Sequence, residues 1–275
     1  MGTKLTREQV EETVNSARQK GERPNFGDAD LSGVDLSGMN LSMSDLSGVD
    51  LSTADLSRTL LSNANLIGTD FSGADLSGAD LSEALLSGAN FVQANLRRAN
   101  LNEASLNGAK FTKADLSRAN LNGANLGGAN FKGANLSRSD LRAANLQWVN
   151  FSQANMSDAD LHNASLREAR IDNTTKLDDK WRLVWKIVHE GAVDQDLNGA
   201  DLSRVNLRRA DLCQANLSGA DLSESDLSRA DLTEANLEGA NLAGAILLKA
   251  KITDKQLGAV KSLEGATLPD GSRHE

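Results

Sequence analysis

The chain has 275 residues, of which 39% are hydrophobic and only 3% are aromatic, with no Tyr. So few aromatic residues do not suit an ordinary globular core and favour a repeat protein with a narrow core. The net charge of −9 argues against a nucleic-acid binder or a binder of anionic membranes, and the single Cys213 excludes an intrachain disulfide. Without a membrane-length apolar run or a signal-peptide core, the sequence predicts a soluble cytoplasmic protein.

The first predicted element is a helix over residues 6–20. Thr6 begins the stretch T-R-E-Q, which has the spacing of a capping box, and Gly21 is placed to end the helix. Repeat proteins need their terminal units covered. We therefore expect residues 1–25 to form an N-terminal capping helix over the open end of the repeats that follow.

A period of five residues begins at Phe26 and continues without a break to Ile171. Each unit has a large apolar residue at its centre and a small one, usually Ala, two positions earlier; Asp or Asn stands between them. Phe recurs at every twentieth position, which makes four units one coil and each unit one side of a square. This column of Phe is predicted to be a structural core and consists of Phe71, Phe91, Phe111, Phe131 and Phe151.

The sequence also predicts how the coils turn and stack. Coils should lie about 4.8 Å apart and bond to one another through their backbones, while Asp and Asn bond the backbone locally. Ser-Gly after a centre suits a corner, because Gly tolerates the positive φ of a type II turn. Arg, Glu or Gln in place of that Gly suggests a type I or irregular corner.

Residues 172–195 interrupt the repeats. Trp181, Val184, Trp185 and Val188 mark an amphipathic helix over 179–190, which we expect beside one continuous stack of coils. The repeats resume in a second register. The predicted segments are therefore 1–25, the β-helix of 26–171, the helical insertion 172–195, the β-helix of 196–252, and a C-terminal cap and tail over 253–275.

Units such as "ADLSG", "ANLRR", "ANFKG" and "ADLSR" closely resemble the pentapeptide-repeat family, whose consensus is A-(D/N)-L-x-x. The resemblance covers about three-quarters of the chain. It implies an all-β fold, a right-handed quadrilateral β-helix. The N-terminal helix, "ERPNFGDADL", the inserted helix and the ending "GATLPDGS" resemble long-repeat members abundant in cyanobacteria. Better-understood relatives bind DNA gyrase as acidic, DNA-shaped dimers, but this sequence lacks their short projecting loops at matching places.

No group of residues in the sequence suggests catalysis. His162, His189 and His274 are scattered, and His162 is expected on the outer surface in water. The Ser residues recur with the repeat and read as turn formers, and Cys213 is expected to face outward. The sequence predicts a protein that is not an enzyme and has no cofactor and no metal site.

Charge is divided unevenly along the repeats. Residues 26–90 contain ten acidic residues and one basic residue, Arg58, for a net −9, whereas residues 91–171 carry ten bases and six acids, for a net +4. Stacking at intervals of twenty turns these charges into columns. Such charges can simply keep the surface solvated. The alternative is a candidate partner surface made of Asp30, Asp35, Asp50, Asp55, Asp70 and Asp75, with Trp181 and Trp185 on the inserted helix.

These observations favour a non-enzymatic solenoid that acts as a protein-interaction scaffold or regulator with an unidentified protein partner. The alternative function is an acidic DNA mimic that binds a DNA-handling enzyme such as gyrase. No direct binding of nucleic acid or membrane is expected, and a homodimer is left open.

Overall fold

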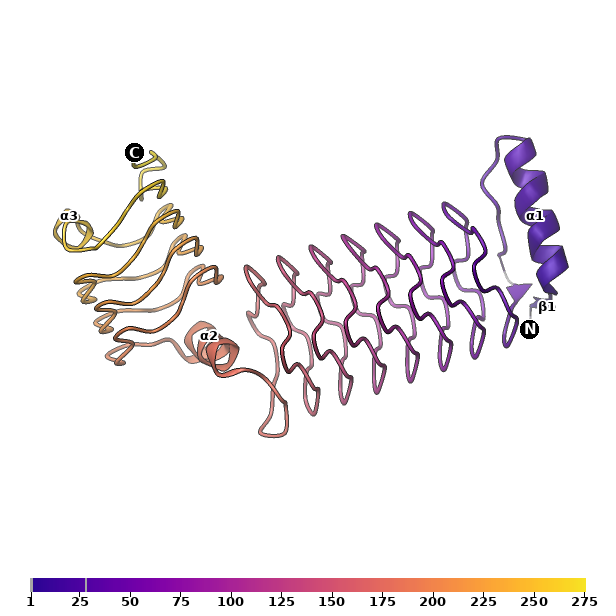
Figure 1. Ribbon diagram of the computed structural model, residues 1–275, viewed down its shortest axis with the longest axis horizontal. Coiled ribbons are helices and arrows are strands. Elements are labelled where there is room, and N and C mark those ends of the chain that lie inside the picture. Colours follow the sequence, from indigo (N-terminus) through magenta and orange to yellow (C-terminus); the bar gives the residue numbers. More distant parts are fainter. Residues whose placement is uncertain (1, 28) are drawn as a thin grey trace. The chain divides into compact units, whose positions relative to one another are not determined.

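The computed structural model of the chain describes residues 2–27 and 29–275 and divides into two compact units. Unit 1 comprises Met1–Asp160 and Glu168–Leu177, and unit 2 comprises Leu161–Arg167 and Asp178–Glu275. The named elements are short (Figure 1). In chain order they are β1 (Thr3–Lys4), α1 (Arg7–Gln19), β2 (Ala29–Asp30), α2 (Asp179–Glu190) and α3 (Asp254–Leu257).

The coils are held by backbone hydrogen bonds between residues that lie twenty apart. Parallel bridges such as Asp50↔Asp70 join the rung residues, by which we mean the residues one position before each centre. Each unit donates twice to the next coil: the N–H of Leu56 bonds the carbonyl of Asp75 at 2.7 Å, and that of Arg58 bonds Ser77 at 3.0 Å. A coil of twenty residues therefore holds four pentapeptides. Because each bridge is one residue long, these solenoids contain few named strands.

The centres and the small residues before them form the interior of both units. Phe71, Phe91, Phe111, Phe131 and Phe151 are each fully buried. Their rings stack with centroids 4.8, 4.8, 4.5 and 5.4 Å apart along the column. This spacing is close to the separation of neighbouring strands in a sheet, so the rings follow the backbone from coil to coil.

The corners have one backbone conformation whatever residue they carry, which corrects the expectation of different corners at Arg, Glu and Gln. In the turn from Leu31 to Val34, whose N–H bonds the Leu31 carbonyl, Gly33 has φ +67°. At the same turn position Arg58 has φ +58° and Gln93 has φ +60°. In Arg58 and Gln93 the N–H bonds a carbonyl of the next coil, which compensates for a conformation that costs roughly 1 kcal/mol at a non-glycine residue.

Rung side chains bond the backbone of their own turn, as predicted. The Asp75 Oδ1 atom accepts the Ser77 N–H at 2.9 Å. It also accepts from Asn95 Nδ2 of the next coil, again at 2.9 Å. Where Asn follows Asn in a column, as at Asn100 and Asn120, the amides continue this ladder. Rung residues thus stabilise both the corner and the stacking.

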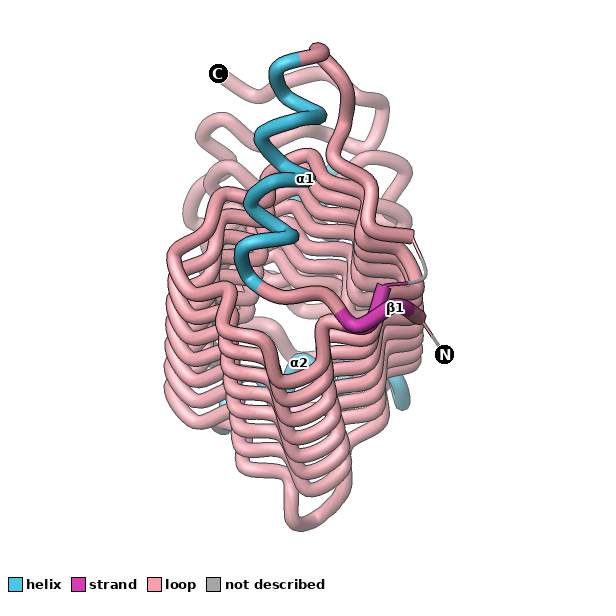
Figure 2. Tube along the Cα trace, turned by 90° about the vertical axis from the view of Figure 1, so that its right-hand side faces the viewer, coloured by secondary structure: helices cyan, strands magenta, loops and turns pink. Residues whose placement is uncertain are grey.

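Helix α1 lies at the N-terminal end of the unit 1 coils (Figure 2). It begins with the predicted capping box, in which Thr6 and Gln9 bond each other's backbone N–H. Val10 and Val14 are buried, and the Arg18 guanidinium donates to the Asn40 carbonyl at 3.0 Å. The helix is thus attached by an apolar face and by polar contacts to the first coils.

Unit 2 contains the predicted helix α2 and a helix that the sequence analysis missed. α2 has the predicted bounds, and Gly191 follows it with φ +74°. α3 begins at a second capping box, formed by Thr253 and Gln256. The tail beyond α3 is held at Thr267, which bridges Arg273 in antiparallel fashion.

Replacing Phe111 by Asp should destabilise unit 1 strongly, because it places a carboxylate in the middle of the stacked rings. We expect a loss of about 3–5 kcal/mol or more. Phe111→Leu should cost far less, since Leu occupies the same column at Leu31 and Leu51. Thermal unfolding of both variants and the parent measures this. Equal melting temperatures for the Asp and Leu variants would contradict the inward position of the ring.

Stability should depend on pH through Asp231. A hydrogen bond from Lys251, with Nζ 2.6 Å from Oδ2, lowers the pKa of Asp231 from 3.8 to about 2. Since the folded-state pKa is the lower one, the stabilisation is complete above about pH 4 and is lost as the pH falls towards 2. Lys251 is exposed and Asp231 is half-buried, so solvent screens the pair and the effect stays below about 1 kcal/mol.

The pH dependence is tested by measuring melting temperature from pH 5 to pH 2. The melting temperature of the Asp231→Asn variant should fall less steeply with decreasing pH than that of the parent. Glu238→Gln, a nearby change of equal charge, should follow the parent. If the Asn variant and the parent fall in parallel, Lys251 contributes nothing through this carboxylate.

Candidate functional site

Two neighbouring columns of aspartates lie on unit 1. Bridges join Asp30, Asp50 and Asp70 in one, and Asp35, Asp55 and Asp75 in the other. We call these six residues the acidic columns. Each Oδ1 accepts the N–H of the residue two positions on, which orients the carboxylate; the Asp55 Oδ1, for example, accepts from Ser57 at 2.9 Å. Among the described residues, no hydrogen bond to the second oxygen is found in Asp50, Asp55, Asp70 or Asp75.

The first member of each column is paired with a cation of the chain, which distinguishes Asp30 and Asp35 from the other four residues of the predicted surface. Lys4 Nζ lies 3.3 Å from Asp30 Oδ1, and Arg7 Nη1 lies 3.3 Å from Asp35 Oδ1. Hydrogen bonds from Ser32, followed by the Lys4 contacts, hold the pKa of Asp30 below its ordinary value. These cations come from the N-terminal segment. Asp28, another acid of this region, lies outside the described residues.

Four aspartates therefore make up the usable acidic surface. In the part of the chain that the structure describes, no Lys or Arg lies within ion-pair distance of them. We call them the four unpaired aspartates: Asp50, Asp55, Asp70 and Asp75. Asp50 and Asp55 are exposed, while Asp70 and Asp75 are half-buried and accept a hydrogen bond from the Asn in the next coil.

Farther along unit 1, basic residues form a column of their own. Backbone bonds from Arg98 to Ser117 and from Arg118 to Ser137 place Arg98, Arg118 and Arg138 at one corner in successive coils. All three are exposed, and Arg138 lies 3.4 Å from Asp158. Unit 1 thus carries aspartate columns and an arginine column in different coils. Asp158 partly neutralises the arginine column.

The tryptophans of α2 are not equivalent. Trp181 exposes only 5% of its surface and meets His162 edge-on, with ring centroids 5.1 Å apart. It is therefore removed from the predicted partner surface, and His162 is half-buried rather than freely solvated. The burial arises because Trp181 lies on the inward stripe of α2 with Val184 and Ile187. Trp185 is half-buried and stacks on His189 at 4.5 Å.

The titratable groups of the described residues bear on two kinds of chemistry, metal binding and nucleophilic attack. Among the described residues no cluster of three His, Cys, Asp or Glu side chains is placed to hold a metal ion. Desolvation, and then the carboxylates of Asp231 and Asp211, raise the pKa of the Cys213 thiol. This disfavours the thiolate that a cysteine nucleophile needs. In the described residues there is also no helix long and apolar enough to cross a membrane.

Comparison with known proteins gives matches of two kinds. The family model for pentapeptide repeats matches eight copies, lying within residues 25–175 and 196–254. One solved structure that matches is HetL, a pentapeptide repeat protein involved in heterocyst differentiation regulation in the cyanobacterium Nostoc. It is 33% identical over 98% of this chain and 100% of HetL, with a TM-score of 0.49. A comparison with curated proteins finds no match.

Two other solved structures cover less of the chain or are less similar in sequence. A pentapeptide repeat protein of the Arabidopsis thaliana thylakoid lumen is 38% identical over 41% of this chain and 71% of its own, with a TM-score of 0.30. QnrB1, a plasmid-mediated fluoroquinolone resistance protein, is 22% identical over 88% and 92%, with a TM-score of 0.26. The extent of the family match shows that this chain belongs to the pentapeptide repeat family and has its right-handed β-helix solenoid fold.

Proposed function

We propose that this protein is a non-enzymatic scaffold or regulator that binds a basic surface of a protein partner through the four unpaired aspartates. The observation that carries the proposal is the free outer oxygen of Asp50, Asp55, Asp70 and Asp75, in two adjacent columns with no cation of the described residues within ion-pair distance. An ordered row of carboxylates on a rigid backbone favours fast, salt-sensitive association with Lys and Arg side chains.

A second candidate function is mimicry of DNA towards a DNA-handling enzyme such as gyrase. It is favoured by the spacing within each acidic column, since successive coils lie about 4.8 Å apart and the phosphates of a DNA strand about 3.4 Å. The match is loose, and the columns contain only two unpaired members each. A supercoiling assay with gyrase separates this candidate from the first.

The proposal includes an arrangement of the solenoid itself. We propose that each coil is four-sided, with one pentapeptide to a side, and that α1 serves as its N-terminal cap. The buried Val10 and Val14 and the Arg18 contact to Asn40 support this assignment. Such a cap keeps the first coil from pairing with other chains and leaves the outer surfaces as the sites of recognition.

Replacing all six residues of the acidic columns by Asn should preserve the fold. Asn already follows Asp in both columns, where Asn90 donates to Asp70 and Asn95 to Asp75, so new amides can extend the existing ladders. Removing like charges along a column should leave the melting temperature of the variant equal to or above that of the parent. A clear fall in melting temperature would mean that the carboxylates are needed for structure.

Partner binding should require the four unpaired aspartates. The immobilised parent should capture partner proteins from a cell extract. The variant that carries Asn at positions 50, 55, 70 and 75 should not capture them. The same binding should weaken steeply with salt, because screening shortens electrostatic range to about 8 Å at physiological ionic strength.

Two controls separate a specific surface from net charge. Asp30→Asn with Asp35→Asn should leave capture unchanged, since those carboxylates are already paired with Lys4 and Arg7. A second variant changes four exposed glutamates elsewhere to Gln, and so has the same net charge as the four-Asn variant; they are Glu103, Glu168, Glu238 and Glu264. Equal loss of capture in this variant and the four-Asn variant would leave the acidic columns with no role beyond charge.

A further inference from the structure

The backbone pairing between coils fails at one place in unit 2. From Asp196 to Asp231 each rung residue has a partner in the next coil, as in Asn216↔Asn236 and Asp231↔Lys251. Among the described rung residues from Asp196 to Ile246, Asn236 alone lacks such a partner. The chain leaves its coil after Ile252, forms α3, and resumes pairing where Ser262 meets Asn241. Pairing is already restored at Gly239, whose N–H bonds the Ala259 carbonyl at 2.9 Å, so part of one side of the coil is missing beneath Glu234 to Leu237.

Two backbone donors are left without acceptors by this departure. In the preceding coil, Gln214 N–H bonds the Thr233 carbonyl at 2.9 Å and Leu217 N–H bonds the Asn236 carbonyl at 2.8 Å. The equivalent donors one coil later are Glu234 and Leu237. For neither N–H is an acceptor found among the described residues. Leu237 is buried, and a buried N–H without a partner costs free energy, so this edge favours a ligand that supplies oxygens.

The carbonyls of the same edge, by contrast, are satisfied from within the chain. Gln256 Nε2 donates to the Leu232 carbonyl at 2.7 Å and to the Ala235 carbonyl at 2.9 Å. Its side chain thus replaces a backbone donor that a regular coil would provide. The edge therefore lacks hydrogen-bond acceptors but not donors. A ligand that binds there must supply acceptors.

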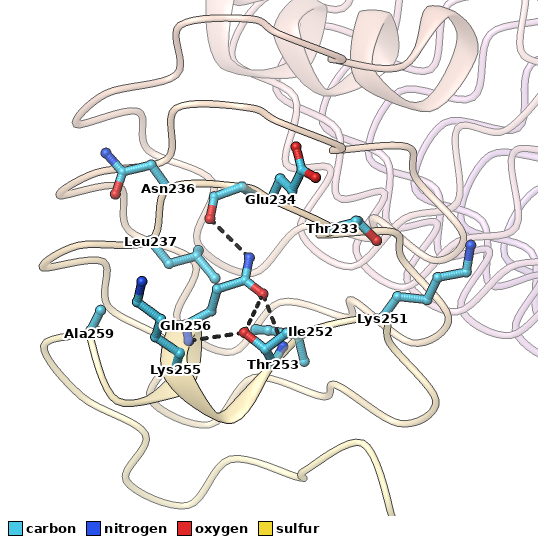
Figure 3. A pocket seen from close by; sticks show the side chains of 11 residues that line it. Thr233, Glu234, Asn236, Leu237, Lys251, Ile252, Thr253, Lys255, Gln256 and Ala259 are labelled. Atoms are coloured by element: carbon cyan, nitrogen blue, oxygen red, sulfur yellow. Dashed lines mark hydrogen bonds between the residues drawn. The ribbon is translucent and has the colours of Figure 1, made fainter.

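A cavity of about 700 Å³ opens at this edge, between the coil segment and α3 (Figure 3). Leu237, Ile252 and Ala259 give it an apolar lining, and Lys255 stands at its border. Among the described residues no acidic side chain pairs with Lys255, whereas Lys251 is paired with Asp231. The volume is that of an ordinary ligand pocket.

We propose that this cavity binds an extended peptide segment of a partner protein, which takes the place of the missing side of the coil. Two peptide carbonyls accept the N–H groups of Glu234 and Leu237. One apolar side chain enters against Leu237, Ile252 and Ala259, and an acidic residue next to it faces Lys255. This is recognition by strand addition, in which main-chain bonds provide affinity and a side-chain pocket provides specificity.

The spacing of the donors selects a peptide over a small anion. Glu234 and Leu237 are three residues apart, and in the regular coils their equivalents bond carbonyls that are also three residues apart. In unit 1, Arg58 and Leu61 bond the carbonyls of Ser77 and Asp80 at 3.0 and 2.7 Å. The segment L-S-G-A-D-L-S, residues 76–82, therefore carries carbonyls, an acid and an apolar residue in the required order.

The experiment uses this seven-residue peptide, blocked at both ends and fluorescently labelled, with the full-length protein. Fluorescence anisotropy should show saturable binding. Ala259→Trp, which fills the cavity from an exposed position, should weaken it at least tenfold, and Lys255→Glu should weaken it severalfold. Lys261→Glu, with the same change of charge outside the cavity, should leave it unchanged.

Hydrogen exchange provides a readout at the proposed donors. The peptide should slow exchange of the Glu234 and Leu237 amides in the parent and not in Ala259→Trp. A peptide with Lys in place of its second Leu should not bind and should not slow hydrogen exchange of these two amides. Absence of saturable binding at millimolar peptide, equal binding by Ala259→Trp, or binding without protection of these two amides would each overturn the proposal. None of these outcomes depends on the acidic columns, so the proposed function is tested separately.

Discussion

The offset of twenty residues in the backbone hydrogen bonds is the constraint on which the rest of the structure depends. Each pentapeptide can satisfy its N–H groups only when the next coil brings carbonyls beneath them, as Asp75 and Ser77 do for Leu56 and Arg58. Once that offset is kept, everything attached to the backbone repeats with it. Phe rings stack, rung amides form ladders, and charges of one sign align. The surface that we assign to partner binding is a direct result of this alignment.

The regular part of the fold could be predicted because it follows from short-range periodicity. The column containing Phe111 and the bounds of α2 both come from counting residues. The corner conformation could not be predicted, since local preference argues against positive φ at Arg58 or Gln93, where a bond to the next coil compensates for it. Here tertiary pairing outweighs local propensity.

Other features depend on how segments distant in the sequence pack. Burial of Trp181 depends on which stripe of α2 faces inward, and an amphipathic pattern with six apolar residues leaves that open. Asp30 and Asp35 form ion pairs because β1 pairs with β2 and brings Lys4 and Arg7 beside them. α3 was missed although T-D-K-Q at Thr253 carries a capping-box signal, since Ile252 still fits the repeat and conceals the departure that follows it.

The two departures from the regular coil share a property that bears on how such a chain can change length. Asn155 pairs with Lys176 and Asn241 with Ser262, each at an offset of twenty-one rather than twenty. The coil absorbs an extra residue, and pairing resumes on the same side at Ile246 and Thr267. At this second departure the coil therefore changes length by one residue while its pairing is kept. Such joints can accept inserted segments of new sequence, and the solenoid can acquire recognition elements without redesign of its interior.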